Sequence, residues 1–227
     1  MKAAVILSGS GVFDGSEIHE SVFTLLALEE NGVDYQCFAP NKSQYHVVNH
    51  LSGEPMEETR NVMVESARIA RGKVKDLIDL SANEFDFLVI PGGFGAAKNL
   101  NQWAIAGPEG ELDEVVQKTV LDFVQTGKPI CGLCMGPTVI AQSLVDEKYA
   151  PILTVGTTKE QSPYDIAGIS NGMETFGSRV EFKTIKEVAV DKELKIVSAP
   201  CYMMEASMVQ VRANIAQAIE ATMELVV

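Results

Sequence analysis

The stretch Gly127-Lys-Pro-Ile-Cys-Gly-Leu-Cys-Met-Gly-Pro137 decides the fold of this chain. Its apolar run ends at Cys134, and small and helix-starting residues follow at once. This pattern predicts a strand that turns sharply into a helix, with Cys134 at the apex in a strained backbone conformation. Free N–H groups and the positive end of the helix dipole would favour the thiolate there. We therefore predict that Cys134 is a nucleophile, with a pKa below the roughly 8.5 of a free cysteine.

Three other interpretations of this cysteine were weighed against the nucleophile. Simple packing is common, because cysteine is among the most often buried residue types. A redox pair with Cys131 requires both sulfurs near one helical turn, whereas Cys131 is predicted to lie inside the strand, roughly 10 Å away and beyond the roughly 7 Å limit for a disulfide. One Cys-x-x-Cys without a second ligand pair is weak evidence for zinc. We expect Cys37, Cys131 and Cys201 to be unreactive.

Composition describes an ordinary globular chain of 227 residues with 46% apolar and 22% charged residues, which we interpret as one domain over residues 1–227. The net charge of −13 argues against a nucleic-acid backbone or an anionic membrane surface as partner. No apolar run approaches the roughly 18 residues of a membrane span. Four scattered cysteines do not resemble a disulfide framework, and we expect a cytoplasmic protein in a reducing environment.

Short apolar runs alternate with longer helical patterns, which predicts an α/β fold with a mostly parallel sheet and crossover helices. The predicted strands are Ala3–Leu7, Val33–Ala39, Phe87–Pro91, Pro129–Leu133, Ile152–Val155 and Lys195–Ala199. The predicted helices lie near Glu17–Asn31, Glu57–Arg71, Glu111–Thr126, Pro137–Val145 and Glu205–Leu225. A hairpin of Glu187–Val190 with Lys195–Ser198 is expected at one edge of the sheet.

Two segments do not fit this alternation. Pro40–Pro55 is a long polar connection that contains His46 and His50, and Thr157–Thr175 is rich in Gly, Ser and Thr and is expected to be an irregular loop. Loops of such length are often lids or pocket walls, although a plain surface excursion fits each of them equally well.

Ligands of open parallel sheets bind beyond the carboxyl ends of the strands. Leu7–Gly11, Pro91–Gly95 and Cys134–Pro137 each end a predicted strand with small residues, so they should meet at one edge. Gly92 and Gly93 allow the backbone to approach a ligand, and with the N–H of Met135 they could form an oxyanion hole. Neither the Rossmann nor the P-loop glycine spacing is present, which argues against a nucleotide.

A reactive thiol usually has a base nearby. The chain has only three histidines and none follows Cys134, so a conventional Cys-His pair is poorly supported. His46 and His50, without an accompanying acid, are more often solvated or hydrogen-bonded than metal ligands. Glu17 and Glu20 open the first helix. We interpret Glu17 as a favourable charge at the helix N-terminus that is free to face water, and we expect Glu20 about 2.6–3.5 Å from the Cys134 sulfur.

These motifs resemble the DJ/PfpI superfamily, which is similar to class I glutamine amidotransferase domains, and within it the ElbB branch, whose members are similar to cofactor-free glyoxalases. The matching segments are Ile6–Glu20, Pro91–Leu100, Cys134 with Gly136-Pro137, Thr59–Asn61 and Asn49–Gly53. The resemblance implies a flavodoxin-like α/β/α sandwich, usually dimeric, without metal or cofactor.

The resemblance also implies roles for individual residues. The nucleophile of the family matches Cys134, its acidic partner matches Glu20, and its oxyanion glycines match Gly92 and Gly93. Met135 stands where PfpI-type proteases have a histidine, which argues against peptidase activity. The histidine–glutamate pair of the amidotransferases has no evident counterpart.

Three functions are therefore open. The first is a glyoxalase-like enzyme that acts on a small reactive carbonyl compound such as glyoxal, with Cys134 forming a hemithioacetal and Glu20 moving the proton. The second is a redox-sensitive thiol in a protein that acts through partners or as a chaperone-like factor. The third is an amidotransferase-like hydrolase whose base comes from a partner chain.

Overall fold

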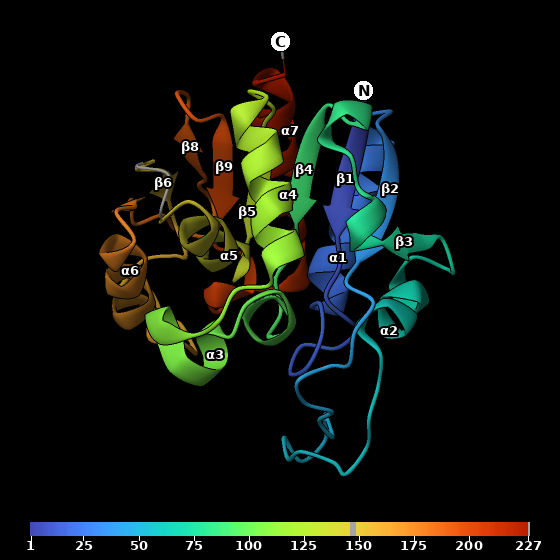
Figure 1. Cartoon of the computed structure of the whole chain (residues 1–227). Coiled ribbons are helices and arrows are strands. Elements are labelled where there is room, and N and C mark those ends of the chain that lie inside the picture. Colours follow the sequence, from blue (N-terminus) through green and yellow to red (C-terminus); the bar gives the residue numbers. More distant parts are fainter. Residues whose placement is uncertain (146–148, 227) are drawn as a thin grey trace.

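The computed structural model of the protein describes residues 1–145 and 149–226. A seven-stranded sheet with the order β3-β2-β1-β4-β5-β9-β8 forms its centre (Figure 1). The strands are β1 Lys2–Ile6, β2 Asp34–Ala39, β3 Val74–Asp76, β4 Phe87–Ile90, β5 Ile130–Leu133, β6 Ile152–Leu153, β7 Arg179–Val180, β8 Ala189–Asp191 and β9 Ile196–Ala199. The α-helices are α1 Ile18–Glu30, α2 Val62–Ile69, α3 Trp103–Ala106, α4 Glu114–Gln125, α5 Gly136–Ser143, α6 Ile166–Thr175 and α7 Met208–Glu224.

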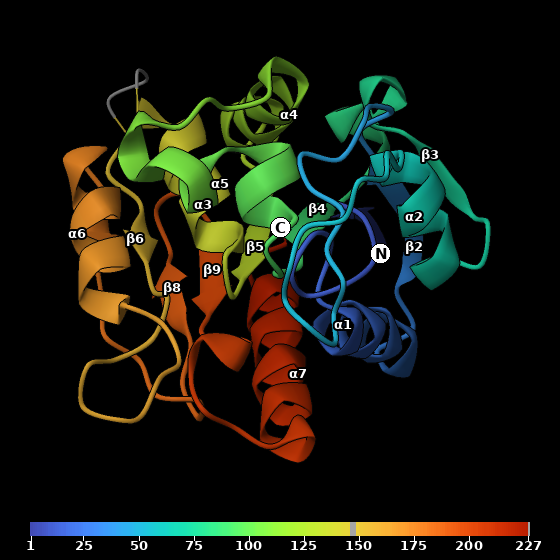
Figure 2. The ribbon, with the colours of Figure 1, turned by 90° about the horizontal axis from the view of Figure 1, so that it is seen from below.

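Helices cover both faces of the sheet. Seen from below, α1 and α7 lie side by side on one face and α4 and α5 lie on the other (Figure 2). Every residue of β4 and β5 is buried, as expected for parallel strands that are covered on both faces and therefore have continuous apolar sequences. The predicted flavodoxin-like three-layer α/β/α sandwich is confirmed.

The sheet is parallel except at one edge. The pairs that β1 forms with β2 and β4, and those that β5 forms with β4 and β9, are parallel, whereas β8 pairs with β9 in the antiparallel sense, as the hairpin prediction required. The chain builds outward from β1 to β2 and β3 on one side, and from β4 to β5 and β9 on the other. The strand order therefore reverses between β1 and β4, where ligands of such sheets usually bind.

Four expectations about elements need correction. The segment predicted as an irregular loop, Thr157–Thr175, contains helix α6, which begins after Asp165 because the Asp165 carboxylate accepts the N–H of Gly168 at 2.9 Å. Its apolar residues Ile166 and Met173 are buried, and this packing outweighs the weak helix propensity of its small residues.

The other three concern strands and a helix start. The predicted strand Ile152–Val155 shortens to β6 and pairs with β7 in a separate two-stranded sheet instead of joining the main one. Strand β3, which has only three residues, was not predicted. Helix α2 begins at Val62 instead of near Glu57, because Asn61 caps it through the N–H of Val64 at 3.0 Å.

Among the described residues, no helix combines the length and the apolar character needed to cross a bilayer. The same residues contain no group of three or more His, Cys, Asp or Glu side chains that could hold a metal ion.

Candidate active site

Cys134 lies at the turn between β5 and α5, as the elbow predicted. Its φ angle of +54° is in the left-handed region that non-glycine residues rarely adopt, so the predicted backbone strain is confirmed. The N–H of Cys134 donates to the carbonyl of Ala199 on the neighbouring strand at 2.9 Å. The strained residue is thus held in place by the sheet, and it is only 5% exposed.

Glu20, in the first turn of α1, is the acidic partner of this cysteine. Its Oε1 accepts the backbone N–H of Tyr202 at 3.0 Å. The second oxygen, Oε2, has no hydrogen-bond partner among the described residues, and like the Cys134 sulfur it lies next to Gly92. Because Glu20 is fully buried, this carboxyl belongs to the site and not to the surface.

The electrostatics of the pair differ from the sequence-based prediction. The pKa of Cys134 lies well above its ordinary value, chiefly because burial disfavours the thiolate and secondly because Glu20 is close. The N–H groups of Gly93 and Met135 act in the opposite direction but do not outweigh burial. The predicted low pKa of the thiol is therefore wrong.

Glu20 has the same kind of shift. Burial, followed by the nearby Glu17 carboxylate, raises the pKa of Glu20 from 4.5 to about 8. At neutral pH the carboxyl is therefore protonated, and the first proton that the pair loses is shared between sulfur and oxygen. A carboxyl with a pKa near 8 is a much stronger base than an ordinary one, which suits proton transfer to and from carbon.

The glycine loop after β4 fits tightly against this pair. A Cβ atom on Gly92 would lie 2.3 Å from Cys134 Cβ and 2.5 Å from Glu20 Oε2, so only glycine leaves room for both side chains. The carbonyl of Gly92 accepts the N–H of Glu17 at 2.9 Å. Gly93 has a φ angle of +94°, and its N–H and that of Met135 lower the pKa of the Cys134 thiol, against the effect of burial. Gly93 and Met135 are therefore the candidate oxyanion donors, and Gly92 lies behind them.

A cavity of about 210 Å³ opens in front of Cys134. Its walls come from segments that are distant in the sequence but follow the carboxyl ends of β1, β4, β5 and β9, together with α3, α6 and the loop before α6. Aromatic rings make up much of this wall, namely those of Phe94, Trp103, Tyr164 and Tyr202.

Glu17 lines the same cavity, which corrects the expectation that it faces water. Its Oε2 caps α1 by accepting the N–H of Glu20 at 2.6 Å, and the residue is only 8% exposed. Burial raises the pKa of Glu17 above its ordinary value. Because His19 Nδ1 lies 3.9 Å from Glu17 Oε1 and 3.0 Å from the Tyr202 hydroxyl, a second polar cluster lies next to the reactive pair.

Two tyrosines of the cavity were missed in the sequence. Tyr202 follows the predicted strand β9, so its position at the carboxyl end of a strand could have indicated it. Tyr164 lies in the loop before α6, where the only signal was the length of the segment. Burial, and then Cys134 and Glu20, raise the pKa of Tyr164 to about 12, so its phenol stays a hydrogen-bond donor at physiological pH. Its ring packs edge-on against Phe94, with the two centroids 5.8 Å apart.

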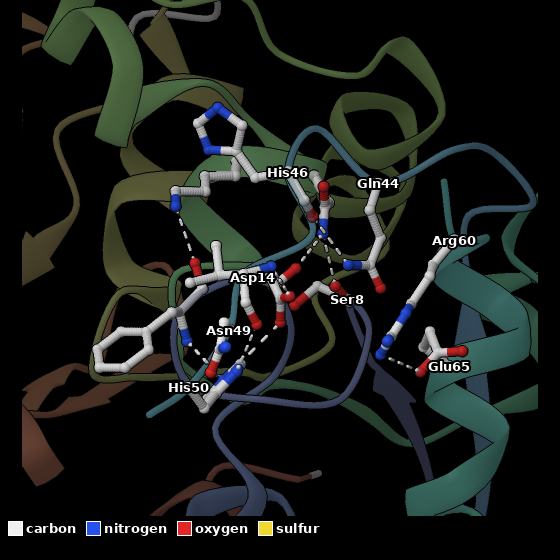
Figure 3. Close-up of polar contacts among 12 residues, drawn as sticks. Ser8, Asp14, Gln44, His46, Asn49, His50, Arg60 and Glu65 are labelled. Carbon is white, nitrogen blue, oxygen red and sulfur yellow. Dashed lines mark hydrogen bonds and ion pairs between the residues drawn. The ribbon is translucent and has the colours of Figure 1, made fainter. Parts of the chain in front are cut away.

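The other two histidines do not contribute to this cavity. Both belong to the connection between β2 and α2, where Figure 3 shows a separate group of polar contacts around Asp14. His50 accepts the N–H of Phe13 at 3.2 Å through Nε2, while its Nδ1 lies 3.0 Å from the carbonyl of Val48. Asp14 accepts the N–H of Val48 at 2.7 Å. The cluster joins this connection to the loop after β1. The His50 ring is hydrogen-bonded, which was one of the alternatives to a metal ligand given above.

The remaining cysteines are free and buried. Burial raises the pKa of Cys37 and of Cys131 to about 12, and it raises that of Cys201 as well. None of the three lines the cavity in front of Cys134, so a ligand there meets the Cys134 sulfur and not theirs.

Comparison with known proteins identifies the class. The sequence profile described as the DJ-1/PfpI family matches residues 2–151, and the chain belongs to this family. The family includes proteases and glyoxalases.

Particular relatives extend the match over the whole chain. The human glutamine amidotransferase-like class 1 domain-containing protein 3, mitochondrial, is 39% identical, and the match covers 99% of this chain and 83% of the human one. The rat ES1 protein homolog, mitochondrial, is 37% identical over 99% of this chain and 84% of its own. An isoprenoid biosynthesis protein with an amidotransferase-like domain from Ehrlichia chaffeensis, solved as a crystal structure, is 34% identical, with 99% of each chain covered and a TM-score of 0.89.

The names of these relatives contradict the expected cytoplasmic location, since the human and rat proteins are both mitochondrial. The physical reason for the error is simple. Free cysteines indicate a reducing environment, but they do not say which compartment provides it.

Proposed function

We propose that the protein is a cofactor-independent glyoxalase-like enzyme that converts small dicarbonyl compounds to hydroxy acids. The observation that carries the proposal is the buried Cys134–Glu20 pair, in which a thiol and a carboxyl with raised pKa values meet at the end of a cavity. One nucleophile and one carboxyl that alternates between acid and base are sufficient for this reaction.

The proposed reaction starts from the pair with one proton. The Cys134 sulfur adds to the aldehyde carbon, and Glu20 protonates the oxygen, which gives a hemithioacetal and leaves Glu20 ionised. Glu20 then removes the hydrogen of the former aldehyde carbon to give an enediol, and returns the proton to the neighbouring carbon, which gives a thioester. Water cleaves the thioester to the hydroxy acid and restores the pair. The aldehyde carbon is oxidised while its neighbour is reduced, so no external oxidant or reductant is needed.

Other groups of the cavity support these steps. The N–H groups of Gly93 and Met135, which favour the thiolate of Cys134, would also stabilise negative charge on a substrate oxygen next to the sulfur. Tyr164 adds a neutral phenol in the same cavity, and none of the hydrogen bonds found among the described residues uses its hydroxyl. We propose that the Tyr164 hydroxyl donates a hydrogen bond to the second carbonyl oxygen of the dicarbonyl compound. Tyr202 holds Glu20 through its backbone N–H.

The same observations disfavour the two alternatives. A sensor thiol is expected to be exposed and acidic, whereas Cys134 is buried and its pKa is raised. A glutaminase must bind the α-carboxylate of glutamine, and no lysine or arginine is among the residues that line the cavity.

The proposal is tested by glyoxal turnover of the metal-free protein and of Cys134→Ala. We expect formation of glycolic acid by the wild type and a loss of at least about 1,000-fold in the variant, because the covalent route is closed. Cys37→Ala, which removes a buried thiol distant from the cavity, serves as the control and should keep full activity. Equal turnover by Cys134→Ala, or none by the wild type, would contradict the proposal.

A further inference from the structure

The cavity is far more apolar than glyoxal requires. Four aromatic rings, those of Phe94, Trp103, Tyr164 and Tyr202, face it together with aliphatic and thioether side chains. Its volume of about 210 Å³ is several times the roughly 30 Å³ that one water molecule occupies in the liquid. A substrate without an apolar group would make little contact with these rings. An apolar group buried against them would add roughly 25 cal/mol of binding free energy per Å² of apolar surface removed from water.

Charge at the cavity favours a neutral ligand. Its ionisable lining consists of the Glu17 carboxyl, the Cys134 thiol and the two phenols, with Glu20 behind the sulfur. A carboxylate or phosphate on the substrate would therefore meet acidic groups and no cation. The Lys98 ammonium lies 5.3 Å from the centroid of the Phe94 ring, but it donates to the carbonyl of Phe13 at 2.8 Å.

From these two observations we infer that the site prefers an uncharged 2-oxoaldehyde that carries an aryl or branched alkyl group over glyoxal, and that it rejects oxoacid anions. The reactive carbonyl lies at Cys134, and the apolar group lies among the rings of Phe94, Trp103 and Tyr164. The inference rests on the proposed function for the reaction, but the ligand preference follows from the cavity alone.

The ligand preference can be measured without turnover. Unreactive probes are tested for their ability to slow the alkylation of Cys134 by iodoacetamide, followed by peptide mass spectrometry at a pH of about 8.5, where the pair has lost its first proton. Acetophenone represents the neutral aryl carbonyl, acetone the small one and benzoate the anion. We expect acetophenone to slow labelling about tenfold at a concentration at which acetone and benzoate have little effect, since apolar contacts in a pocket discriminate by roughly 10–200-fold.

Two variants locate the effect. Phe94→Ala should reduce the protection by acetophenone about tenfold, whereas Phe182→Ala, which alters an exposed phenylalanine outside the cavity, should not change it. Ala104→Lys places a cation at the exposed rim of the cavity and should allow benzoate to protect Cys134. This second variant keeps the test decisive if Phe94→Ala does not fold.

Turnover of phenylglyoxal and of glyoxal is measured separately, so that the two ideas can fail independently. Protection by acetophenone without turnover of either compound would contradict the enzyme and leave the ligand preference standing. Turnover of glyoxal, combined with equal protection by acetone, benzoate and acetophenone, would overturn the inference and leave the enzyme standing. We expect kcat/KM to be at least about tenfold higher for phenylglyoxal than for glyoxal.

Discussion

At the scale of single residues, the chemistry depends on how many protons Cys134 and Glu20 hold together. Both groups are buried, and burial disfavours the charged form of each. The thiol and the carboxyl must therefore be treated as one titrating pair and not as a thiolate beside a neutral acid. Sequence patterns suggested an acidic cysteine because they show the helix N-terminus, but they do not show how completely the site is closed to water.

This pair predicts the pH dependence of turnover. The pKa of Glu20 is raised from 4.5 to about 8, so below that pH the pair carries two protons and the thiol is not activated. We expect kcat/KM to rise about tenfold per pH unit up to about 8 and then to level off. A pH–rate profile between about 6 and 9.5 measures this, with the rate of Cys134 alkylation as a parallel readout. A kcat/KM that does not change with pH over that range would contradict the claim that Cys134 and Glu20 titrate as a pair near pH 8.

At the scale of elements, four loops at the carboxyl ends of strands bring the site together. The loops after β4 and β5 could be predicted, since Pro91–Gly95 and Cys134–Pro137 end apolar runs with small residues. The contribution of the segment after β9 was missed, although Tyr202 follows a strand that was predicted. Helix α6 was also missed, because glycine and serine lower its intrinsic propensity while buried contacts stabilise it.

The loop after β4 gives a prediction about Gly92. In Gly92→Ala the new Cβ atom would lie 2.3 Å from Cys134 Cβ, so the pair must separate. We expect turnover to fall at least about 100-fold, because misplaced reacting groups lose about that much. Gly53→Ala is the control: its φ angle of +77° strains the backbone, but nothing lies within 4 Å of the added atom. Stability is followed by thermal unfolding, and wild-type turnover by Gly92→Ala would contradict the close fit.

At the scale of the whole molecule, the alternation of strands and helices was enough to predict a mostly parallel sheet with crossover helices, and the resemblance to a family implied the three-layer sandwich. The order of the strands was not predictable in the same way, because it depends on pairing between segments that are distant in the sequence. The site also depends on contacts between segments that are distant in the sequence. Glu20, Gly93, Cys134 and Tyr164 are brought together only by the folded sheet, and the choice of Glu20 as the partner of Cys134 needed both helix geometry and the resemblance to a family.

Helix α1 also predicts the assembly state. Its outer face carries three large apolar side chains at a spacing of four residues, Ile18, Val22 and Leu26, which therefore form one stripe along the helix. They are between 37% and 46% exposed, and such a continuous exposed apolar stripe often marks an interface. We propose that a second copy of the chain covers this stripe in a homodimer. Val22→Asp should shift the protein to the monomer in sedimentation velocity, whereas Ile78→Asp, at an exposed residue away from α1, should not. A monomeric wild type would contradict the proposal.

The central claim, that Glu20 moves the proton for Cys134, is tested most directly by Glu20→Gln. Glutamine can still accept the N–H of Tyr202 and donate to the sulfur, but it cannot take a proton from carbon. The measurement compares dicarbonyl turnover with the alkylation rate of Cys134 in the same preparation at a pH of about 8.5. The account predicts a thiol that is still alkylated and turnover that falls at least about 100-fold, in line with the loss of a general acid–base group. Turnover equal to that of the wild type would show that Glu20 is structural and that the mechanism is wrong.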